Sequence, residues 1–299
     1  MKSRVAPVRE RRPASFYGLA AIFALFVLFL YGPVITIFIL SFQGPEGGLT
    51  FPMRGMSLHW FSSLANGLGG VDIWGAFGRS MRLALVVTAL TVLCSVCAGL
   101  AFRKVFRGAG AVFYLSISSL IMPSIIVSLG IGLMFRLIDL GVKSTATALG
   151  FQNFADNYTT AMGLYTSALG AHLTWTLPFG LLVMFAVFNR FNPAFEEAAR
   201  DLGATPWQSF RHVVLPIIGP AVIGVGMFGF TLSWDEIART SQAIGDLNTL
   251  PLELQGLTTS VTTPAIYALG TMTTVLSLTV MIGGLFVVRA LGVRRQKTA

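Results

Sequence analysis

The sequence predicts an all-α integral membrane protein with six transmembrane helices. Hydrophobic residues make up 54% of the 299 residues and charged residues only 11%, and the mean hydropathy is +0.74. A soluble domain carries roughly 25% charged residues. Six long stretches contain no charged residue. Each can supply the roughly 20 apolar residues with which a helix crosses the hydrocarbon core of a bilayer.

The first uncharged stretch follows a basic N-terminal tail. Five lysines and arginines lie within residues 1–13, and the next charged residue is Glu46. A secretory signal peptide has a shorter apolar core of about 7–15 residues and a small-residue cleavage site. We therefore expect a tail over residues 1–15, an uncleaved first span over 16–41, and a periplasmic loop over 42–76 that is rich in glycine and aromatic residues.

The other five spans are predicted from windows between charged residues. These windows run from Arg82 to Arg103, Arg107 to Arg136, Asp156 to Arg190, Arg211 to Asp235 and Glu253 to Arg289. We expect them to form a five-helix core over 77–289, followed by a tail over 290–299. Several predicted spans contain proline, including Pro123 in the third. Such prolines line a bundle interior or a pathway, where the freed backbone groups find partners, or they merely bend a helix.

The distribution of lysine and arginine predicts the orientation. With the N-terminus inside, the inside segments hold 15 of the 21 basic residues, and the outside segments hold only Arg54, Arg79, Arg82, Arg136, Lys143 and Arg239. Because cytoplasmic loops carry an excess of basic residues, both termini are expected in the cytoplasm. The net charge of +9 follows this topology. It does not indicate nucleic-acid binding, which needs a basic patch on a folded face.

A polar segment, residues 192–216, separates the fourth and fifth predicted spans and contains two helix-start signals. Asn192 is a suitable N-cap, and Pro193 suits the first helical position, which needs no N–H donor. Gly203 can adopt the left-handed conformation that ends a helix. Thr205, with proline next and glutamine three residues later, matches a capping box. The segment is therefore predicted to be a helix, a glycine turn and a second short helix.

The spacing in this segment resembles the EAA loop of permease subunits of type I ABC importers. That pattern is EAA, three residues, glycine, six residues, phenylalanine, then I-x-L-P, and Val213 in place of isoleucine is the one departure. The resemblance implies a MetI-like five-helix core and a cytoplasmic loop that plugs into a separate ATPase subunit. The alternative is an ordinary connection between two spans. The implied ATPase-coupling residues are Glu196, Glu197, Ala198, Ala199, Gly203, Phe210, Leu215 and Pro216.

The sequence offers no catalytic constellation. No glycine is followed by lysine, so the nucleotide-binding motif G-x-x-x-x-G-K-[ST] is absent. The three histidines are far apart, and the Cys94 and Cys97 pair alone is a poor zinc site. We therefore expect no enzyme activity, no catalytic residue, no metal site and no cofactor in this chain. The resemblance implies that ATP and magnesium belong to the partner ATPase.

Four residues are candidates for a substrate path. Trp234, Asp235 and Glu236 close the fifth predicted span at its outer end. Two carboxylates beside an aromatic ring attract an amine through charge and cation–π contact. The alternative is a solvated helix end. His172 lies inside the fourth predicted span, where an ionisable residue is a functional candidate by default. A histidine that is hydrogen-bonded across helices is the other interpretation.

The last third of the chain resembles permeases of the spermidine/putrescine branch of ABC importers. The resemblance rests on Ser233–Glu236, Thr249–Leu252, Thr262–Ala265 and Ala268–Thr271. It implies a permease subunit in the bacterial inner membrane that passes a polyamine-like or other amine or amino-acid-derived solute to the cytoplasm. The implied partners are a cytoplasmic ABC ATPase dimer, a second permease that is a paralogue, a periplasmic solute-binding protein and membrane lipid, with no nucleic acid.

The alternative function is a secondary active transporter of a small solute. Such a transporter is expected to show an internal repeat and buried ion-coupling charges within its spans. The sequence shows no clear repeat, and the only ionisable group well inside a predicted span is His172. The sequence therefore favours the ABC importer permease.

Overall fold

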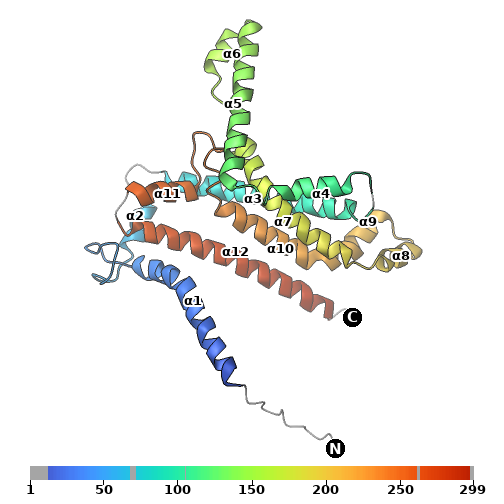
Figure 1. The fold of residues 1–299 in the computed structure, drawn as a ribbon, viewed down its shortest axis with the longest axis horizontal. Helices are drawn as coiled ribbons and strands as arrows, with labels where there is room; N and C mark the ends of the chain where they lie inside the picture. The colour runs from blue at the N-terminus through green and yellow to red at the C-terminus, as the bar shows by residue number, and fades with distance from the viewer. Residues whose placement is uncertain (1–12, 68–71, 105, 261–262, 297–299) are drawn as a thin grey trace, which may run out of the picture. The chain divides into compact units, whose positions relative to one another are not determined.

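The computed structural model describes residues 13–67, 72–104, 106–260 and 263–296, and this part of the chain is built from helices (Figure 1). The helices in chain order are α1 (Ala14–Leu40), α2 (His59–Ala65), α3 (Ile73–Ala101), α4 (Ala109–Ser118), α5 (Ser124–Ala148), α6 (Gln152–Asn157), the π-helical turn η1 (Leu164–Ala168), α7 (Leu169–Asn189), α8 (Ala194–Asp201), α9 (Pro206–Ser209), the π-helical turn η2 (Phe210–Val214), α10 (Leu215–Trp234), α11 (Leu250–Ser260) and α12 (Ala265–Gln296).

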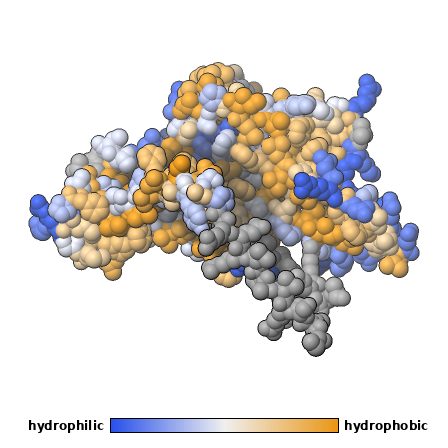
Figure 2. Space-filling view, turned by 60° about the horizontal axis from the view of Figure 1, so that its bottom comes forward, coloured by the Kyte–Doolittle hydropathy of each residue, from blue (hydrophilic) through white to orange (hydrophobic). Residues whose placement is uncertain are grey.

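The predicted all-α fold with six spans is confirmed. Six helical stretches are long and apolar enough to cross a membrane: α1, α3, α5, η1 with α7, α9 through α10, and α12. The first predicted span, 16–41, corresponds to α1. Hydrophobic residues form much of the molecular face in Figure 2, as expected for helices that contact lipid. Most of the predicted N-terminal tail lies outside the described residues.

The third span differs from the prediction. We expected one span within the window from Arg107 to Arg136, but the structure divides this window between α4 and the first half of α5. The helix that qualifies as a span is α5, which continues through Arg136 to Ala148. Pro123 lies at the N-cap of α5 rather than inside a helix. Proline lacks the N–H that a continuous helix needs, and it disfavours helical geometry in the residue before it.

The chain divides into two compact units, one formed by residues 1–66 and 262–272 and the other by 67–261 and 273–299. In the first unit, the loop after α1 folds on the buried side chain of Gln43. The Gln43 amide accepts a hydrogen bond from the backbone N–H of Arg54 at 2.8 Å and donates one to the carbonyl of Gly48 at 3.1 Å. The hydroxyl of Tyr267, in the first turn of α12, donates to the carbonyl of Leu49 at 2.8 Å.

The second unit is organised around α3, α7 and α10, which lie side by side (Figure 1). The hydroxyls of Thr91 in α3 and Thr176 in α7 are hydrogen-bonded at 2.7 Å. A Cβ added at Gly180 would lie 2.2 Å from the hydroxyl oxygen of Ser95, so glycine is needed where these two helices approach closely. Small residues and hydroxyl pairs are the usual means of packing helices inside a membrane. This three-helix bundle carries the segment 192–216 at one end.

Candidate functional site

The first helix of the segment 192–216 ends as the sequence predicts and begins one residue later. Pro193, expected at the first helical position, is the N-cap of α8, and the side chain of Asn192 before it accepts a hydrogen bond from the N–H of Ala194 at 3.0 Å. Gly203 has φ +83°, in the left-handed region. The N–H of Gly203 donates to Arg200 and the N–H of Ala204 donates to Ala199. This is the Schellman arrangement, which satisfies the last carbonyls of a helix.

The second helix begins as predicted but does not stand alone. Thr205 and Gln208 form both hydrogen bonds of a capping box, at 2.8 and 3.3 Å. From there α9 continues through η2 into α10 without a break. The π-helical turn lies directly before Pro216, which cannot donate the usual backbone hydrogen bond to the preceding turn. The prediction of a separate second helix is therefore wrong, because α9 is the first turn of the fifth span.

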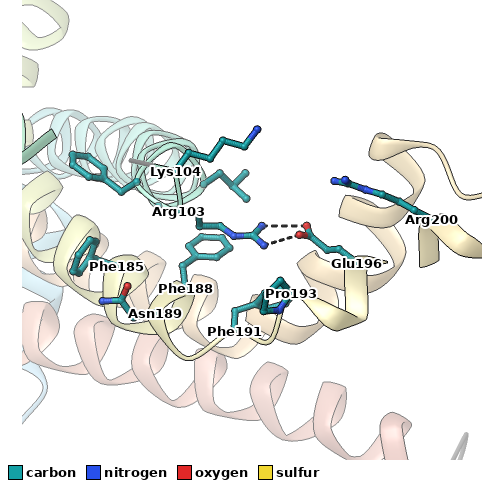
Figure 3. Close-up of a pocket in the computed structure, with 12 residues that line it drawn as sticks. Arg103, Lys104, Phe185, Phe188, Asn189, Phe191, Pro193, Glu196 and Arg200 are labelled. Atoms are coloured by element: carbon teal, nitrogen blue, oxygen red, sulfur yellow. Dashed lines mark hydrogen bonds and ion pairs between the residues drawn. The ribbon is translucent and has the colours of Figure 1, made fainter. Parts of the chain in front are cut away.

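An ion pair attaches the start of α8 to the end of α3 (Figure 3). Arg103 donates two hydrogen bonds to the Glu196 carboxylate, at 3.1 and 2.6 Å. The Arg103 guanidinium also lies over the rings of Phe188, at 5.5 Å, and Phe191, at 5.0 Å. The hydrogen bonds from Arg103 lower the pKa of Glu196 below its ordinary value. A bidentate pair of this kind fixes the orientation of the carboxylate relative to the guanidinium as well as the distance between them.

The opposite face of the segment is exposed and partly apolar. Glu197 and Ala198 are exposed, Leu202 is 90% exposed and Trp207 is 65% exposed. Ala199 is half-buried. The remaining predicted coupling residues lie toward the bundle end: Phe210 packs against the core that contains Val214 and Ile218, and Leu215 and Pro216 are exposed. Of the two adjacent glutamates, therefore, Glu196 holds the loop in place and Glu197 faces outward.

His172 lies buried in α7, with only 1% of its surface exposed. Its Nδ1 atom is 2.8 Å from the Ser233 hydroxyl, and its Nε2 atom is 2.8 Å from the Thr240 hydroxyl. The Thr240 hydroxyl donates its proton to the carbonyl of Glu236 at 2.6 Å, so it must accept from Nε2–H. In the neutral tautomer, Nδ1 then accepts from the Ser233 hydroxyl. This arrangement matches the interhelical interpretation of His172.

The three residues at the C-terminal end of α10 and directly after it occupy different environments. Trp234 is buried, stacks on Phe230 at 5.8 Å and meets Phe77 edge-on at 5.5 Å. Glu236 accepts the backbone N–H of Arg239 at 2.8 Å. Asp235 is exposed at the surface. Neighbouring atoms nevertheless shield its carboxylate from water and raise its pKa. Only Asp235, of the four predicted path residues, therefore presents an accessible group without a hydrogen bond to another described residue.

Arg239 was not among the candidates, because a single arginine in a loop gives no signal in the sequence. The structure buries it completely. Its guanidinium donates to the Ser119 carbonyl at 2.8 Å and to the Thr174 hydroxyl at 2.5 Å, and it lies 4.8 Å from the centre of the Trp175 ring. Ser119 is the residue that ends α4. Arg239 therefore satisfies a carbonyl that the break between α4 and α5 leaves free.

Comparison with known proteins places this geometry in a family. Residues 164–293 match the family described as binding-protein-dependent transport system inner membrane component. The putrescine transport system permease protein PotI of Escherichia coli (strain K12) is 31% identical over 247 residues, which cover 82% of this chain and 81% of that protein. The chain belongs to this family of inner membrane components.

Other relatives agree with this assignment. The spermidine/putrescine transport system permease protein PotC of Escherichia coli (strain K12) is 28% identical over 87% of this chain and 90% of that protein. A solved bacterial ABC transporter involved in alginate import has a similar fold, with a TM-score of 0.60 at 17% identity, over 92% of this chain and 94% of that chain. This binding-protein-dependent inner membrane component is accordingly a multi-pass permease subunit of an ABC importer in the bacterial inner membrane.

Proposed function

We propose that this permease carries a small cationic solute of the polyamine class across the inner membrane and is driven by an ATPase that docks on the segment 192–216. Both termini and this segment lie on the cytoplasmic side, as the distribution of basic residues indicates. ATP and magnesium are held by the ATPase, and this chain supplies no cofactor. A paralogous second permease completes the pathway, and a periplasmic binding protein delivers the solute.

The exposed apolar face of α8 and α9 carries this proposal. Leu202 and Trp207 are largely exposed. They lie in the segment 192–216, which the distribution of basic residues assigns to the cytoplasmic side of the membrane. Exposed large apolar side chains on an otherwise polar helical element are typical of a protein interface, where aromatic residues are enriched. Glu197 is exposed in the first turn of α8 and offers a charge that can orient a partner.

The described contacts explain how movement of the docked segment would reach the spans. The second helix continues directly into α10, and the Arg103–Glu196 pair joins the first helix to the end of α3. Because α3 and α10 pack against each other and against α7, a tilt of α8 would be transmitted to both. The Schellman turn at Gly203 keeps the two short helices at a constant angle, so that the segment moves as a lever.

Docking is tested by co-purification of the ATPase encoded next to this chain, together with ATPase activity of the reconstituted complex. We expect Leu202→Asp to weaken ATPase binding by about tenfold or more, because a buried apolar contact at an interface centre contributes about 1–3 kcal/mol. Leu247→Asp, at an exposed leucine beyond the other end of α10, is the matched control and should leave ATPase binding unchanged. Equal binding by the wild type and the Leu202 variant would refute docking on this segment.

The cationic solute is inferred from two observations. The relatives PotC and PotI are named as permeases of spermidine and putrescine transport systems. In this chain, Asp235 presents a shielded carboxylate at the outer end of α10, with a pKa above its ordinary value. An approaching ammonium group would stabilise the charged carboxylate and lower that pKa again. A cation is thus the ligand that this position favours.

Asp235→Asn is expected to raise the KM for uptake of putrescine by about five- to tenfold with little change at saturating solute, since an exposed charge pair contributes about 1 kcal/mol. The direction of the pH dependence follows from the raised pKa. The carboxylate is charged only at a pH above its pKa, so the affinity of the wild type for putrescine should fall as the external pH decreases. The Asn variant should lack this pH dependence. An unchanged KM and pH profile in the variant would show that Asp235 is only a solvated helix end.

A further inference from the structure

We propose that the cavity at the base of the segment 192–216 binds the phosphate group of an anionic membrane lipid. The cavity has a volume of about 470 Å³ and lies where α3 and α7 end and α8 begins. This volume is within the range of about 300–1,000 Å³ found for small-molecule sites. The proposal goes beyond docking of an ATPase, because the ligand enters between the permease's own helices.

The charges that line this cavity favour an anion. Arg103, Lys104 and Arg200 are basic, and Glu196 is the one acidic residue among the lining side chains, so the net charge is +2. Arg103 already neutralises Glu196 through its two hydrogen bonds. Lys104 and Arg200 form no ion pair with any described residue. Arg200 is close enough to Glu196 to help lower its pKa, but Glu196 is already paired with Arg103, so both cations remain available to a bound anion.

The positions of these two residues suit one shared ligand. In Figure 3, Lys104 and Arg200 extend from opposite sides toward the space beside the Arg103–Glu196 pair. A phosphate group accepts hydrogen bonds from both an ammonium and a planar guanidinium. Because the two side chains come from α3's end and from α8, a phosphate between them would bridge the bundle and the lever.

The apolar part of the cavity indicates a lipid rather than a free ion. Phe185, Phe188 and Phe191 form its wall, and it opens at the ends of two membrane-spanning helices. A free phosphate has no group that contacts such a wall, whereas the glycerol and upper acyl chain of a phospholipid do. Basic pockets between helices at the cytoplasmic surface bind lipid headgroups in this way. The acyl chain would extend along α4, whose Tyr114 and Leu115 are exposed.

The test measures binding of a fluorescent short-chain phosphatidylglycerol to the full-length permease in a zwitterionic detergent. Unlabelled phosphatidylglycerol, phosphatidylcholine of the same chain length and inorganic phosphate serve as competitors. We expect competition by phosphatidylglycerol alone. The double variant Lys104→Gln/Arg200→Gln should bind about thirtyfold more weakly, because each basic residue near an anionic lipid surface contributes about 1 kcal/mol.

The matched control is Arg190→Gln/Arg211→Gln, which removes two exposed basic residues at the same end of the bundle that do not line the cavity. It should change the affinity by less than threefold. Equally weakened phosphatidylglycerol binding in both double variants would overturn the proposed site. It would show that the lipid is attracted to any basic residue at this end of the bundle. Competition by inorganic phosphate at the same concentration would overturn the lipid assignment. The assay needs no ATP turnover, so its outcome is independent of whether an ATPase docks on Leu202 and Trp207.

Discussion

Arg103→Ala is expected to reduce solute transport per ATP hydrolysed by about tenfold or more, while the permease still inserts and binds its ATPase. The variant leaves the Glu196 carboxylate, whose side chain is only 17% exposed, without its bidentate partner. Leaving a largely buried charged group unpaired costs about 1–3 kcal/mol or more, which corresponds to about tenfold or more in an equilibrium constant. It also removes the contacts of the guanidinium with Phe188 and Phe191. The start of α8 would then move without α3.

The measurement is uptake into proteoliposomes, compared with ATP hydrolysis in the same sample. Because Arg103 also lines the proposed lipid cavity, Lys104→Gln/Arg200→Gln is assayed in parallel; it keeps the ion pair, so its transport ratio measures any contribution of the lipid. Arg190→Gln/Arg211→Gln, outside the cavity, should keep the wild-type ratio. The charge-swapped variant Arg103→Glu/Glu196→Arg should recover part of the lost coupling, since the two charges again face each other. A normal ratio of transport to hydrolysis in Arg103→Ala would contradict the lever mechanism.

Arg239→Leu is expected to destabilise the permease by about 2–4 kcal/mol, a large fraction of the stability of most folded proteins. Three acceptors lose their donor, namely the Ser119 carbonyl and the hydroxyls of Thr174 and Ser124, and each buried group left unsatisfied costs about 1–3 kcal/mol. Arg239→Lys should recover little, because an ammonium cannot reach both acceptors and lie flat on Trp175 at once. Unfolding in detergent, followed by the fluorescence of the buried Trp60 and Trp234, provides the measurement.

Arg54→Leu removes an exposed arginine side chain and serves as the control, with an expected change within about 0.5 kcal/mol. Limited proteolysis gives a second readout. If Arg239 holds the break between α4 and α5, its loss should increase cleavage near residues 119–124 before global unfolding. Equal stability and equal cleavage in the wild type and the Arg239 variant would show that the burial of this side chain has no structural role.

Local signals explain why the segment 192–216 could be predicted so closely. A polar side chain before a helix, a left-handed glycine and a capping box involve residues only two to five positions apart. The structure shows the glycine and the capping box, and Asn192 bonds the first residue of α8 from one position before the N-cap. The prediction failed for the connection between the second short helix and the fifth span. The second short helix was expected to stand apart from the fifth span, but a π-helical turn joins α9 to α10.

Local sequence signals could not predict which role each of the predicted site residues has in the structure. Glu196 and Glu197 are adjacent and chemically equivalent in sequence, yet one pairs with Arg103 and the other is exposed. Arg103 is 93 positions away from Glu196 in the sequence. His172 is likewise explained by Ser233 and Thr240, which lie on a different part of the chain. Only the packing of α3, α7 and the residues after α10 brings these groups within hydrogen-bond distance.

The sequence by itself determined the membrane class, the number of spans, and the glycine turn and capping box of the exposed segment. Hydrophobic length, charge exclusion and helix capping are properties of a contiguous stretch, so they can be read without the fold. The tertiary structure alone decided that α4 and α5 are separate helices and that Arg239 is buried at their junction. A buried arginine is stable only when distant groups satisfy it, and the sequence does not show which distant groups the fold brings together.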